Sequence, residues 1–335
     1  METRSFGRTG LEISRLTFGC GAVGGLMTKG SAADQDNAVA WAREHGINFF
    51  DTAASYGNGV SESNLGRALR GKRDGAVVAT KVALGEADMA DIAGAIHRSL
   101  EASLQRLQMD QVDIFQLHNT VSSTAVRGAR TSGSTITVAQ VLDEVIPALQ
   151  ALRDAGKIRF LGFTANGDVT SLHQLVACGA FDSAQIFYNL LVPSAGQVMP
   201  PNYPAVDFRQ LLHKAETHGV GSIGVRVLAG GALSGHDGRH PLGMQEVRPI
   251  GSDTTYATDV ARARLFASVV EAGFADNLAE LAVRYAISSP VLSTTEIGIA
   301  TLSELQQAVA AVAKGPLPAQ ALALISQIQS GLADD

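Results

Sequence analysis

Short apolar runs, rich in β-branched and aromatic residues, recur along the chain, and helix-like patterns lie between them. On this basis we predict eight buried strands. They lie in SRLTFGC from Ser14, INFFDTA from Ile47, GAVVATKV from Gly75, QVDIFQLH from Gln111, IRFLGFTA from Ile158, SAQIFYN from Ser183, GVGSIGV from Gly219 and LSTTEIGI from Leu292. Successive runs start roughly 40 residues apart on average, the length of a strand with its crossover helix. The runs are apolar on both faces, as strands of a covered parallel sheet are.

Three of the segments between these runs carry clear helix signals. Residues Ser31 to His45 begin at a good N-cap residue and end before Gly46, a favoured residue after a helix. The segments Ala90 to Leu107 and Val138 to Ala155 repeat apolar residues every three or four positions. Pro147 interrupts the second of these, which predicts a kink or a later helix start there. Eight strands alternating with helices favour a closed (β/α)₈ TIM barrel over an open doubly wound sheet.

Two connections are long, from Asn119 to about Thr137 and from Ser234 to about Tyr256. Each follows a strand, so both are expected at the C-terminal face of the barrel, where ligands bind. Loops of this length are usually lids or binding loops, and the other interpretation is a variable surface insertion. No segment has the composition of a linker, so we expect one domain over residues 1–335.

Composition and charge exclude several classes of protein. With 46% hydrophobic residues the chain of 335 residues can bury a large core, which argues against global disorder. A net charge of −6 without a basic block argues against a nucleic-acid partner. Cys20 and Cys178 form neither a CxxC pair nor a zinc pattern, so we expect no metal site and a reducing compartment. No run is long enough to span a membrane and the start lacks a secretory signal, so the expected location is the cytoplasm.

One motif points to a different fold. Gly19 to Gly24 reads G-x-G-x-x-G after a predicted strand, and Asp51 resembles the acidic ribose ligand of a Rossmann fold. In that fold the helix begins within the glycine motif, so that its N-terminus meets the pyrophosphate. Here the segment GLMTKG, residues 25–30, intervenes before the helix signal near Ser31, which argues against a Rossmann fold.

Four chemically capable residues lie at the ends of successive predicted strands. Asp51 and Tyr56 follow the second strand, Lys81 closes the third and His118 closes the fourth. Because the C-terminal ends of barrel strands meet at one pocket, we expect these side chains to be neighbours. Taken singly, each has an ordinary interpretation as a cap, a surface residue or a structural histidine. Together they indicate proton transfer to a carbonyl oxygen.

The expected roles follow from the side-chain chemistry. A tyrosine titrates near pH 10, and the Lys81 ammonium is expected to lower the pKa of Tyr56 by stabilising its phenolate. Asp51 would hold Lys81 charged, and His118 would hydrogen-bond the substrate oxygen. Another interpretation, a lyase or isomerase on the same barrel, uses Lys81 as a Schiff-base nucleophile.

These residues lie within motifs that resemble the aldo-keto reductase family. The motifs are FFDTAxxYG from Phe49, SExxLG from Ser61, ATK from Ala79 and GKIRFLG from Gly156, with RSFGRTGL from Arg4. The resemblance runs from residue 4 to about residue 313. It implies a (β/α)₈ barrel with an N-terminal hairpin that transfers hydride between nicotinamide and a carbonyl or alcohol. By this resemblance Tyr56 is the general acid/base, Lys81 and Asp51 tune it, and His118 orients the substrate.

The resemblance also implies cofactor contacts. Gly19, Cys20 and Gly21 match the segment beside the nicotinamide ribose, Thr164 and Gln185 the carboxamide site, Arg226, Leu228 and Gly230 the run after the seventh strand, and Gly298, Thr301 and Glu304 the adenosine end. Ala165 stands where the family usually has asparagine, and Val225 replaces the tyrosine that stacks on the nicotinamide. Arg226 is interpreted as a pyrophosphate ligand or as a salt-bridge partner.

The adenosine end departs from the pattern that binds NADP. Glu304 stands at the position of the arginine that grips the 2′-phosphate, and no Lys or Arg occurs between Arg284 and Lys314. A carboxylate repels phosphate and accepts a hydrogen bond from a ribose hydroxyl, which favours NAD over NADP. The other interpretation of Glu304 is an exposed residue in the first turn of a helix.

Two functions from different classes follow from the sequence. The first is an NAD(P)-dependent oxidoreductase acting on a small neutral or sugar-like carbonyl or alcohol. The second is a non-catalytic regulatory barrel that binds nucleotide and senses redox state. We favour the first, because all four polar residues at the strand ends are present.

Overall fold

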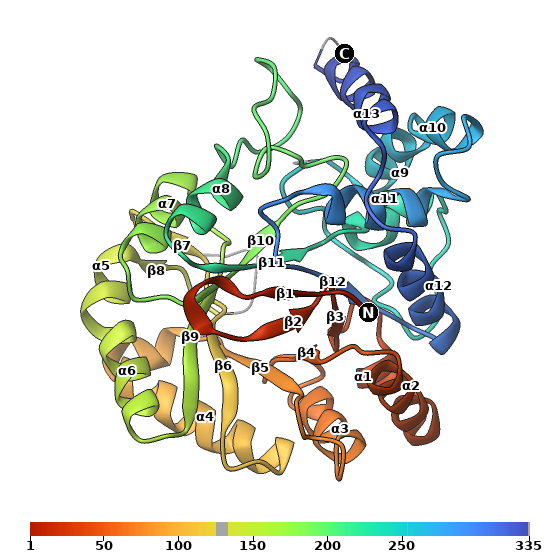
Figure 1. Ribbon diagram of the computed structural model, residues 1–335. Helices are drawn as coiled ribbons and strands as arrows, with labels where there is room; N and C mark the ends of the chain where they lie inside the picture. The colour runs from red at the N-terminus through yellow and green to blue at the C-terminus, as the bar shows by residue number, and fades with distance from the viewer. Residues whose placement is uncertain (125–132, 253, 334–335) are drawn as a thin grey trace.

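Eight parallel strands close into a barrel in the order β10-β11-β12-β3-β4-β5-β6-β9, with helices around it (Figure 1). The computed structural model describes residues 1–124, 133–252 and 254–333. The barrel strands are β3 (Leu16–Gly19), β4 (Phe49–Asp51), β5 (Val77–Val82), β6 (Val112–Leu117), β9 (Ile158–Thr164), β10 (Ser183–Phe187), β11 (Gly221–Val225) and β12 (Thr294–Gly298). Each predicted run contains one of these strands, and the predicted TIM barrel is confirmed. The first predicted run, from Ser14, belongs to two strands: Ser14 is the last residue of a hairpin strand, and the barrel strand begins at Leu16.

The helices connect and cover the strands. They are α1 (Leu26–Lys29), α2 (Ala32–Glu44), α3 (Val60–Ala68), α4 (Ile92–Leu107), α5 (Val138–Gln140), α6 (Ile146–Asp154), α7 (Val169–Ala177), α8 (Leu211–Thr217), α9 (Tyr256–Arg264), α10 (Ala267–Glu271), α11 (Leu278–Ser288), α12 (Leu302–Ala313) and α13 (Ala319–Gly331). Short 3₁₀ turns are η1 (Gly7–Thr9), η2 (Glu86–Ala90) and η4 (Ala229–Ser234), and η3 (Val141–Val145) is a π turn. Apolar residues of the helices and the outer strand faces form the main core.

The helix starts have local chemical causes. Ser31 caps α2 by accepting a hydrogen bond from the Asp34 amide at 3.1 Å, as its N-cap position predicts. The next predicted helix starts slightly later than its apolar pattern suggests. Asp91 accepts a hydrogen bond from the Gly94 amide at 3.0 Å and so fixes the start of α4 at Ile92.

The helix around Pro147 continues instead of breaking. The π turn η3 lies directly before α6, whose first turn contains Pro147. Proline has no amide hydrogen to donate to the preceding turn, and a π turn shifts the hydrogen-bond register by one residue. The expected irregularity is therefore real, but it takes the form of a wider helical turn.

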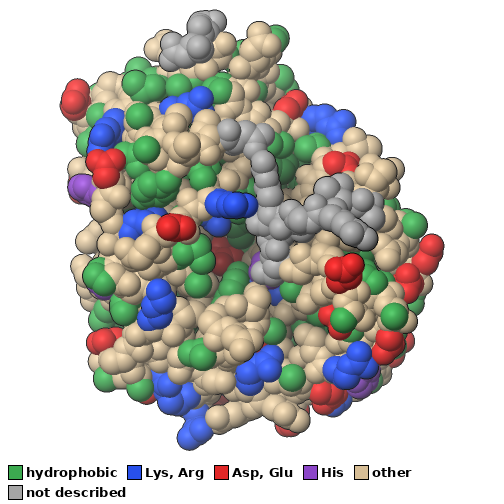
Figure 2. All heavy atoms as spheres, turned by 180° about the vertical axis from the view of Figure 1, so that it is seen from behind, with side chains coloured by type: hydrophobic (Ala, Val, Ile, Leu, Met, Phe, Trp, Pro, Cys, Tyr) green, Lys and Arg blue, Asp and Glu red, His purple; other side chains and the backbone are tan. Residues whose placement is uncertain are grey.

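A hairpin closes the bottom of the barrel. Strands β1 (Thr3–Ser5) and β2 (Glu12–Ser14) pair antiparallel, and Phe6 between them is fully buried against the lower barrel interior. The Phe6 ring meets the Phe49 ring edge-on at 5.7 Å between centroids. Figure 1 shows this hairpin crossing one end of the barrel, and Figure 2 shows the opposite face, which is hollowed near its centre. The end of the barrel that is open to solvent is therefore its C-terminal face.

The glycine motif after β3 serves close packing and not a Rossmann turn. The short helix α1 lies within the segment that we expected to be non-helical, and it begins after Gly25. At Gly24 an added Cβ would lie 2.2 Å from the Ile299 amide nitrogen, so only glycine allows this approach. The motif thus joins the first and last barrel strands at the mouth.

The two long connections differ in how much of them is described. In the first, β7 (Val121–Ser122) pairs with β8 (Ile136–Thr137), and residues 125–132 lie outside the described residues. The second crosses the mouth, where the Met244 amide donates to the Ala22 carbonyl at 3.1 Å. In the described ranges, no helix has both the length and the apolar character needed to cross a bilayer.

Candidate active site

The four predicted catalytic residues meet at the floor of the mouth. Lys81 Nζ donates to a carboxylate oxygen of Asp51 and, at 3.2 Å, to the Tyr56 hydroxyl. The Tyr56 and His118 rings lie edge-to-face with centroids 6.0 Å apart. Asp51 and Lys81 come from neighbouring strands, and Tyr56 and His118 from the loops that follow β4 and β6. The expected convergence of successive strand ends is therefore what the structure shows.

Asp51 and Lys81 form a fully buried ion pair with further partners. Lys81 Nζ also donates to the Thr52 carbonyl at 2.7 Å, and Gln116 Nε2 donates to the second Asp51 oxygen at 2.9 Å. Burial lowers the pKa of Lys81, but the charges of Asp51, Tyr56 and Glu296 and the hydrogen bond to Asp51 together outweigh burial, so the pKa is raised. Lys81 is therefore an ammonium without a free electron pair, which argues against a Schiff-base nucleophile.

The expected direction of the Tyr56 shift is wrong. The Lys81 ammonium does lower the pKa of Tyr56, but burial outweighs it and raises the pKa to about 12. The sequence could not predict this result, because the depth of the phenol depends on the whole barrel. At neutral pH Tyr56 is a protonated phenol that holds its proton at the mouth.

His118 is an uncharged imidazole in this setting. Burial and the nearby Lys81 ammonium lower the pKa of His118 to about 3. Its buried Nδ1 atom has no hydrogen-bond partner among the described residues. His118 also lines the cavity, so its neutral imidazole is suited to hydrogen-bond a ligand oxygen through the ring edge that faces the opening.

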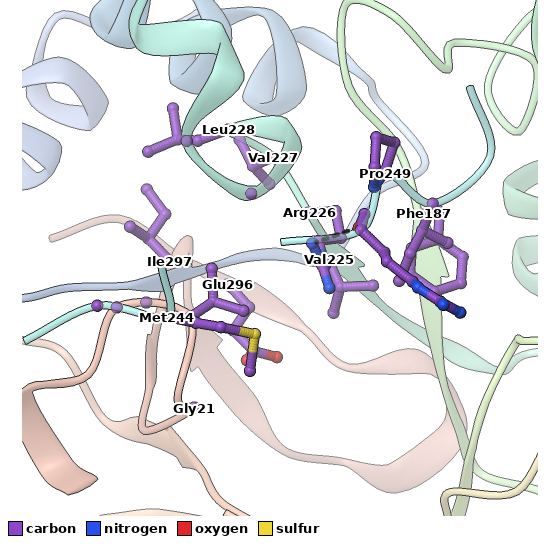
Figure 3. Close-up of a pocket in the computed structure, with 18 of the residues that line it drawn as sticks. Gly21, Phe187, Val225, Arg226, Val227, Leu228, Met244, Pro249, Glu296 and Ile297 are labelled. Atoms are coloured by element: carbon purple, nitrogen blue, oxygen red, sulfur yellow. Dashed lines mark hydrogen bonds between the residues drawn. The ribbon is translucent and has the colours of Figure 1, made fainter. Parts of the chain in front are cut away.

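A cavity of about 1950 Å³ opens above these residues. Its lining includes Gly21, Tyr56, His118, Gln185, Arg226 and Glu304, which come from widely separated parts of the sequence. Figure 3 shows part of this wall, with Val225, Val227 and Leu228 from the segment at the end of β11. The volume exceeds that of an ordinary drug-sized pocket and is sufficient for an extended ligand.

The family follows from a match over nearly the whole chain. A model described as "Aldo/keto reductase family" matches residues 15–330. The chain belongs to the aldo/keto reductase family. The site described above thus occurs in an oxidoreductase family that uses NAD(P)H.

Individual relatives agree with this family. The chain is 30% identical over 320 residues to a protein named L-galactose dehydrogenase from Arabidopsis thaliana, covering 93% of this chain and 88% of that protein. It is 27% identical over 340 residues to a protein named probable voltage-gated potassium channel subunit beta from the same plant, covering 95% and 93%. An aldo-keto reductase from Bacillus halodurans, solved in its holo form, superposes with a TM-score of 0.71 at 24% identity, covering 98% and 96%.

At the segment after β3, only part of the predicted cofactor contact faces the cavity. Gly21 lies against the Tyr56 ring, where an added Cβ would be 3.6 Å from it. Gly19 and Cys20 lie behind this surface and do not line the cavity. The Cys20 thiol is buried in the core, and burial raises its pKa well above the usual value.

The two predicted carboxamide residues of this aldo/keto reductase are held together. Thr164 Oγ1 donates to Gln185 Oε1 at 3.0 Å, and Gln185 Nε2 donates to Glu296 Oε2 at 3.0 Å. Asn166, next to the substituted Ala165, donates its side-chain amide to Thr120 Oγ1 at 2.7 Å. Thr164, Gln185 and Glu296 therefore form one hydrogen-bonded row at the predicted carboxamide site.

The segment after β11 places Arg226 in the wall of the cavity. Among the described residues, the Arg226 guanidinium forms one long hydrogen bond, to the Arg248 carbonyl at 3.4 Å, and no carboxylate pairs with it. The described residues therefore do not support the interpretation of Arg226 as a salt-bridge partner. Leu228 and Gly230 line the cavity beside it, and Gly230 has a left-handed φ of 70°. Arg226 remains a predicted anion ligand.

The predicted adenosine end lies at the start of α12. Thr301 caps this helix by accepting from the Glu304 amide at 3.3 Å, and Glu304 Oε2 accepts from the Ala300 amide at 2.6 Å. Gly298, Ala300 and Glu304 line the cavity, whereas Thr301 does not. One Glu304 oxygen thus supports the helix start, and the exposed side chain keeps a second oxygen for a ligand.

Sequence analysis missed three residues of this site. Gln116 and Glu296 belong to predicted strands, and Arg239 belongs to the second long connection. Gln116 is the last residue but one of β6, a position that would have singled it out. Glu296 lies in the middle of β12, where strand position alone gives no such signal. Arg239 donates to the carbonyls of Gly230 and Val23 and had no local signal. Over the described ranges, no group of three or more His, Cys, Asp or Glu side chains is arranged to hold a metal ion.

Proposed function

We propose that this aldo/keto reductase catalyses hydride transfer between a nicotinamide cofactor and a small neutral or sugar-like carbonyl or alcohol. The observation that carries the proposal is the contact of Lys81 Nζ with both Asp51 and the Tyr56 hydroxyl at the floor of the cavity. A phenol held beside a buried ammonium, with a neutral imidazole across from it, is suited to move a proton at a carbonyl oxygen.

The protein residues act on that oxygen. Tyr56 donates its hydroxyl proton to the carbonyl oxygen during reduction, and the adjacent Lys81 ammonium stabilises the phenolate that is left. His118 hydrogen-bonds the same oxygen and orients it, since its imidazole is neutral. A bound nicotinamide supplies or accepts the hydride. Alcohol oxidation is the reverse step: Tyr56 must first lose its proton, and its phenolate then accepts the hydroxyl proton, which favours oxidation at alkaline pH.

The residues present fit a nicotinamide dinucleotide. Gly21, Tyr56 and His118 line the floor of the cavity, and the absence of a side chain at Gly21 leaves room for a ring beside Tyr56. Gln185 and Thr164 offer amide and hydroxyl groups for a carboxamide. Arg226, which has no carboxylate partner in the described chain, offers a fork of donors for a pyrophosphate.

We infer that NAD is preferred over NADP. Glu304 places a carboxylate at the end of the cavity where a 2′-phosphate would need positive charge. Lys314, which also lines the cavity, is held by Asp276 and Glu280 at 2.7 Å each. Titration of intrinsic fluorescence with NADH and NADPH tests this inference. We expect NADH to bind at least about ten-fold more tightly, and a preference for NADPH would contradict the inference.

The name of one relative supports a sugar-like substrate. The plant protein that matches over 93% of this chain is an L-galactose dehydrogenase, which acts on a neutral polyhydroxy compound. Thr120, Ser122 and Thr135 line the cavity of this chain and provide hydroxyl groups for such a substrate. A panel of neutral aldoses, small aldehydes and charged carbonyl compounds tests the class, with the neutral compounds expected as substrates.

Replacing Tyr56 by phenylalanine tests the catalytic assignment. We expect Tyr56→Phe to reduce kcat by roughly 10²–10⁴-fold, because the proton donor is lost, while nucleotide affinity stays near that of the wild type. Turnover is followed as absorbance of the reduced nicotinamide, and affinity by fluorescence titration. Full activity of this variant would remove Tyr56 from the reaction.

A regulatory barrel is the second candidate function. The match to a protein named as a channel subunit beta favours it, because that name describes an assembly component and not an enzyme. This hypothesis expects nucleotide binding without turnover of any tested carbonyl or alcohol. Measurable turnover by the wild type that disappears in Tyr56→Phe supports the enzyme over the regulatory barrel.

A further inference from the structure

Glu296 is a carboxylic acid in the wall of the cavity that the mechanism above does not use. It lies in β12 between Thr295 and Ile297, and its side chain is half-buried. Figure 3 shows the Glu296 side chain directed from this strand into the cavity, and Glu296 is one of the residues that line the cavity. An acidic group that is half-buried and takes no part in the proposed proton transfer requires an explanation, since even partial desolvation of a carboxylate is unfavourable.

Glu296 reaches the site where a carboxamide is expected. Its Oε2 accepts from Gln185 Nε2 at 3.0 Å, and Gln185 in turn accepts from Thr164. On its other side lies the backbone of β3, where a Cβ added to Gly19 would be 2.9 Å from Glu296 Oε1. The carboxyl group therefore lies between the carboxamide residues and the β3 wall, beside the expected position of the nicotinamide ring.

No positive charge among the described residues is left over to pair with an ionised Glu296. Titratable groups facing it are Asp51, Lys81, Tyr56 and Cys20. Lys81 and Asp51 form their own ion pair, Tyr56 and Cys20 are uncharged at neutral pH, and no ion pair to Glu296 occurs among the described residues. Burial and the nearby Asp51 raise the pKa of Glu296 to about 8.

We propose that Glu296 makes the site select the oxidised, positively charged form of nicotinamide over the reduced, neutral form. This inference rests on the proposed function. Without Glu296 the charges of Asp51 and Lys81 cancel at the floor, so an ionised Glu296 gives the surroundings of the ring a net negative charge. A negative group in a poorly solvated wall attracts a cationic ring and has no comparable attraction for a neutral one. Where Glu296 is ionised, the enzyme would thus bind the oxidised nucleotide needed for alcohol oxidation and would release the reduced nucleotide readily.

The selection should depend on pH. A cationic ring binds the carboxylate form of Glu296 better than the protonated form, so binding of oxidised nucleotide releases a proton near neutral pH. Affinity for the oxidised form therefore rises as the pH rises through about 8, the pKa of Glu296 in the free enzyme. Affinity for the reduced form does not rise with it.

The experiment compares dissociation constants of NAD⁺ and NADH for the full chain and for Glu296→Gln by calorimetry at pH 6 and pH 9. Glutamine keeps the size of the side chain and an acceptor for Gln185 but removes the charge. We expect the preference for NAD⁺ over NADH at pH 9 to fall by roughly ten-fold or more in the variant, and by less at pH 6. If the wild type binds NADP⁺ and NADPH instead, the same ratio applies to them.

Glu246→Gln is the matched control. Glu246 also lines the cavity, but it lies exposed in the loop over the mouth, so its removal should leave the ratio unchanged. Circular dichroism verifies that both variants fold. If Glu296→Gln does not fold, the wild type alone provides the test. A ratio of NAD⁺ affinity to NADH affinity that is the same at pH 6 and pH 9 overturns the inference.

The outcomes separate this inference from the proposed function. Nucleotide binding with an equal preference in wild type and Glu296→Gln overturns the role of Glu296 alone. Failure of the wild type to bind any nicotinamide nucleotide overturns the proposed function as well. A smaller loss of preference in Glu296→Asp than in Glu296→Gln would support the charge as the cause, because aspartate keeps it at a greater distance.

Discussion

At the scale of single residues, the site depends on buried charges that are matched in pairs. Lys81 and Asp51 have no solvent exposure, and each is stabilised by its partner and by further hydrogen bonds from Gln116 and to Thr52. Removing one member leaves the other charged in a poorly solvated place, whereas removing both leaves no unpaired charge. The pair therefore serves both stability and the electrostatics of Tyr56.

Substitutions of this pair separate the two effects. We expect Lys81→Met to reduce the free energy of unfolding by about 3–5 kcal/mol, because Asp51 loses its counter-charge. Adding Asp51→Asn should restore much of that stability without restoring turnover. Chemical denaturation and steady-state kinetics measure the two quantities. A double variant as unstable as the single one would contradict this account of the pair.

At the scale of elements, parallel strands fix which residues share the mouth. Gly19, Asp51 and Gly298 lie at matched positions on β3, β4 and β12, so these strands end at one level. Helices then pack around the strands at distances set by small residues. At Gly66 of α3 an added Cβ would lie 2.3 Å from the Leu107 carbonyl oxygen of α4.

A pair of glycine substitutions tests this packing. Gly66→Ala is expected to destabilise the fold by about 1–3 kcal/mol, because backbone atoms of the neighbouring helix must move. Gly331→Ala is the matched helical control, since an added Cβ meets nothing within 4 Å there. It should leave stability unchanged or raise it by up to about 1 kcal/mol. Thermal unfolding of both variants makes the comparison, and equal effects would argue against the packing explanation.

At the scale of the whole molecule, distant segments close the mouth on one side. Arg239 lies in the connection between η4 and α9, and its guanidinium bonds the Val23 carbonyl at 3.3 Å and the Gly230 carbonyl. It also lies over the Tyr256 ring, 5.3 Å from its centroid. These contacts join the loops after β3 and β11 across the cavity.

Loosening this connection should affect how long a nucleotide stays bound. We expect Arg239→Met to increase the dissociation rate of the nucleotide by roughly ten-fold, because hydrogen bonds that hold the loop over the cavity are lost. Arg264→Met is the control, since Arg264 pairs with exposed Asp237 at 2.7 Å away from the cavity. Stopped-flow fluorescence measures the rates. Unchanged dissociation in Arg239→Met would show that the loop does not retain the ligand.

The sequence alone determined the barrel and the four residues at its floor. Strand periodicity is a local property, and parallel strands that alternate with helices have few arrangements, so Asp51, Tyr56, Lys81 and His118 could be placed together before any coordinates. Their motifs also identified the family. The cofactor contacts of individual residues and the choice of NAD stay predictions.

Only the tertiary structure decided the electrostatics and the contacts between distant segments. The pKa of Tyr56 is raised instead of lowered, because the effect of burial outweighs that of the Lys81 charge, and the whole barrel sets how deeply the phenol is buried. Glu296 and Arg239 acquire their positions from strands and loops that are far apart in sequence. Local patterns encode which elements form, whereas solvation and long-range neighbours depend on how those elements pack together.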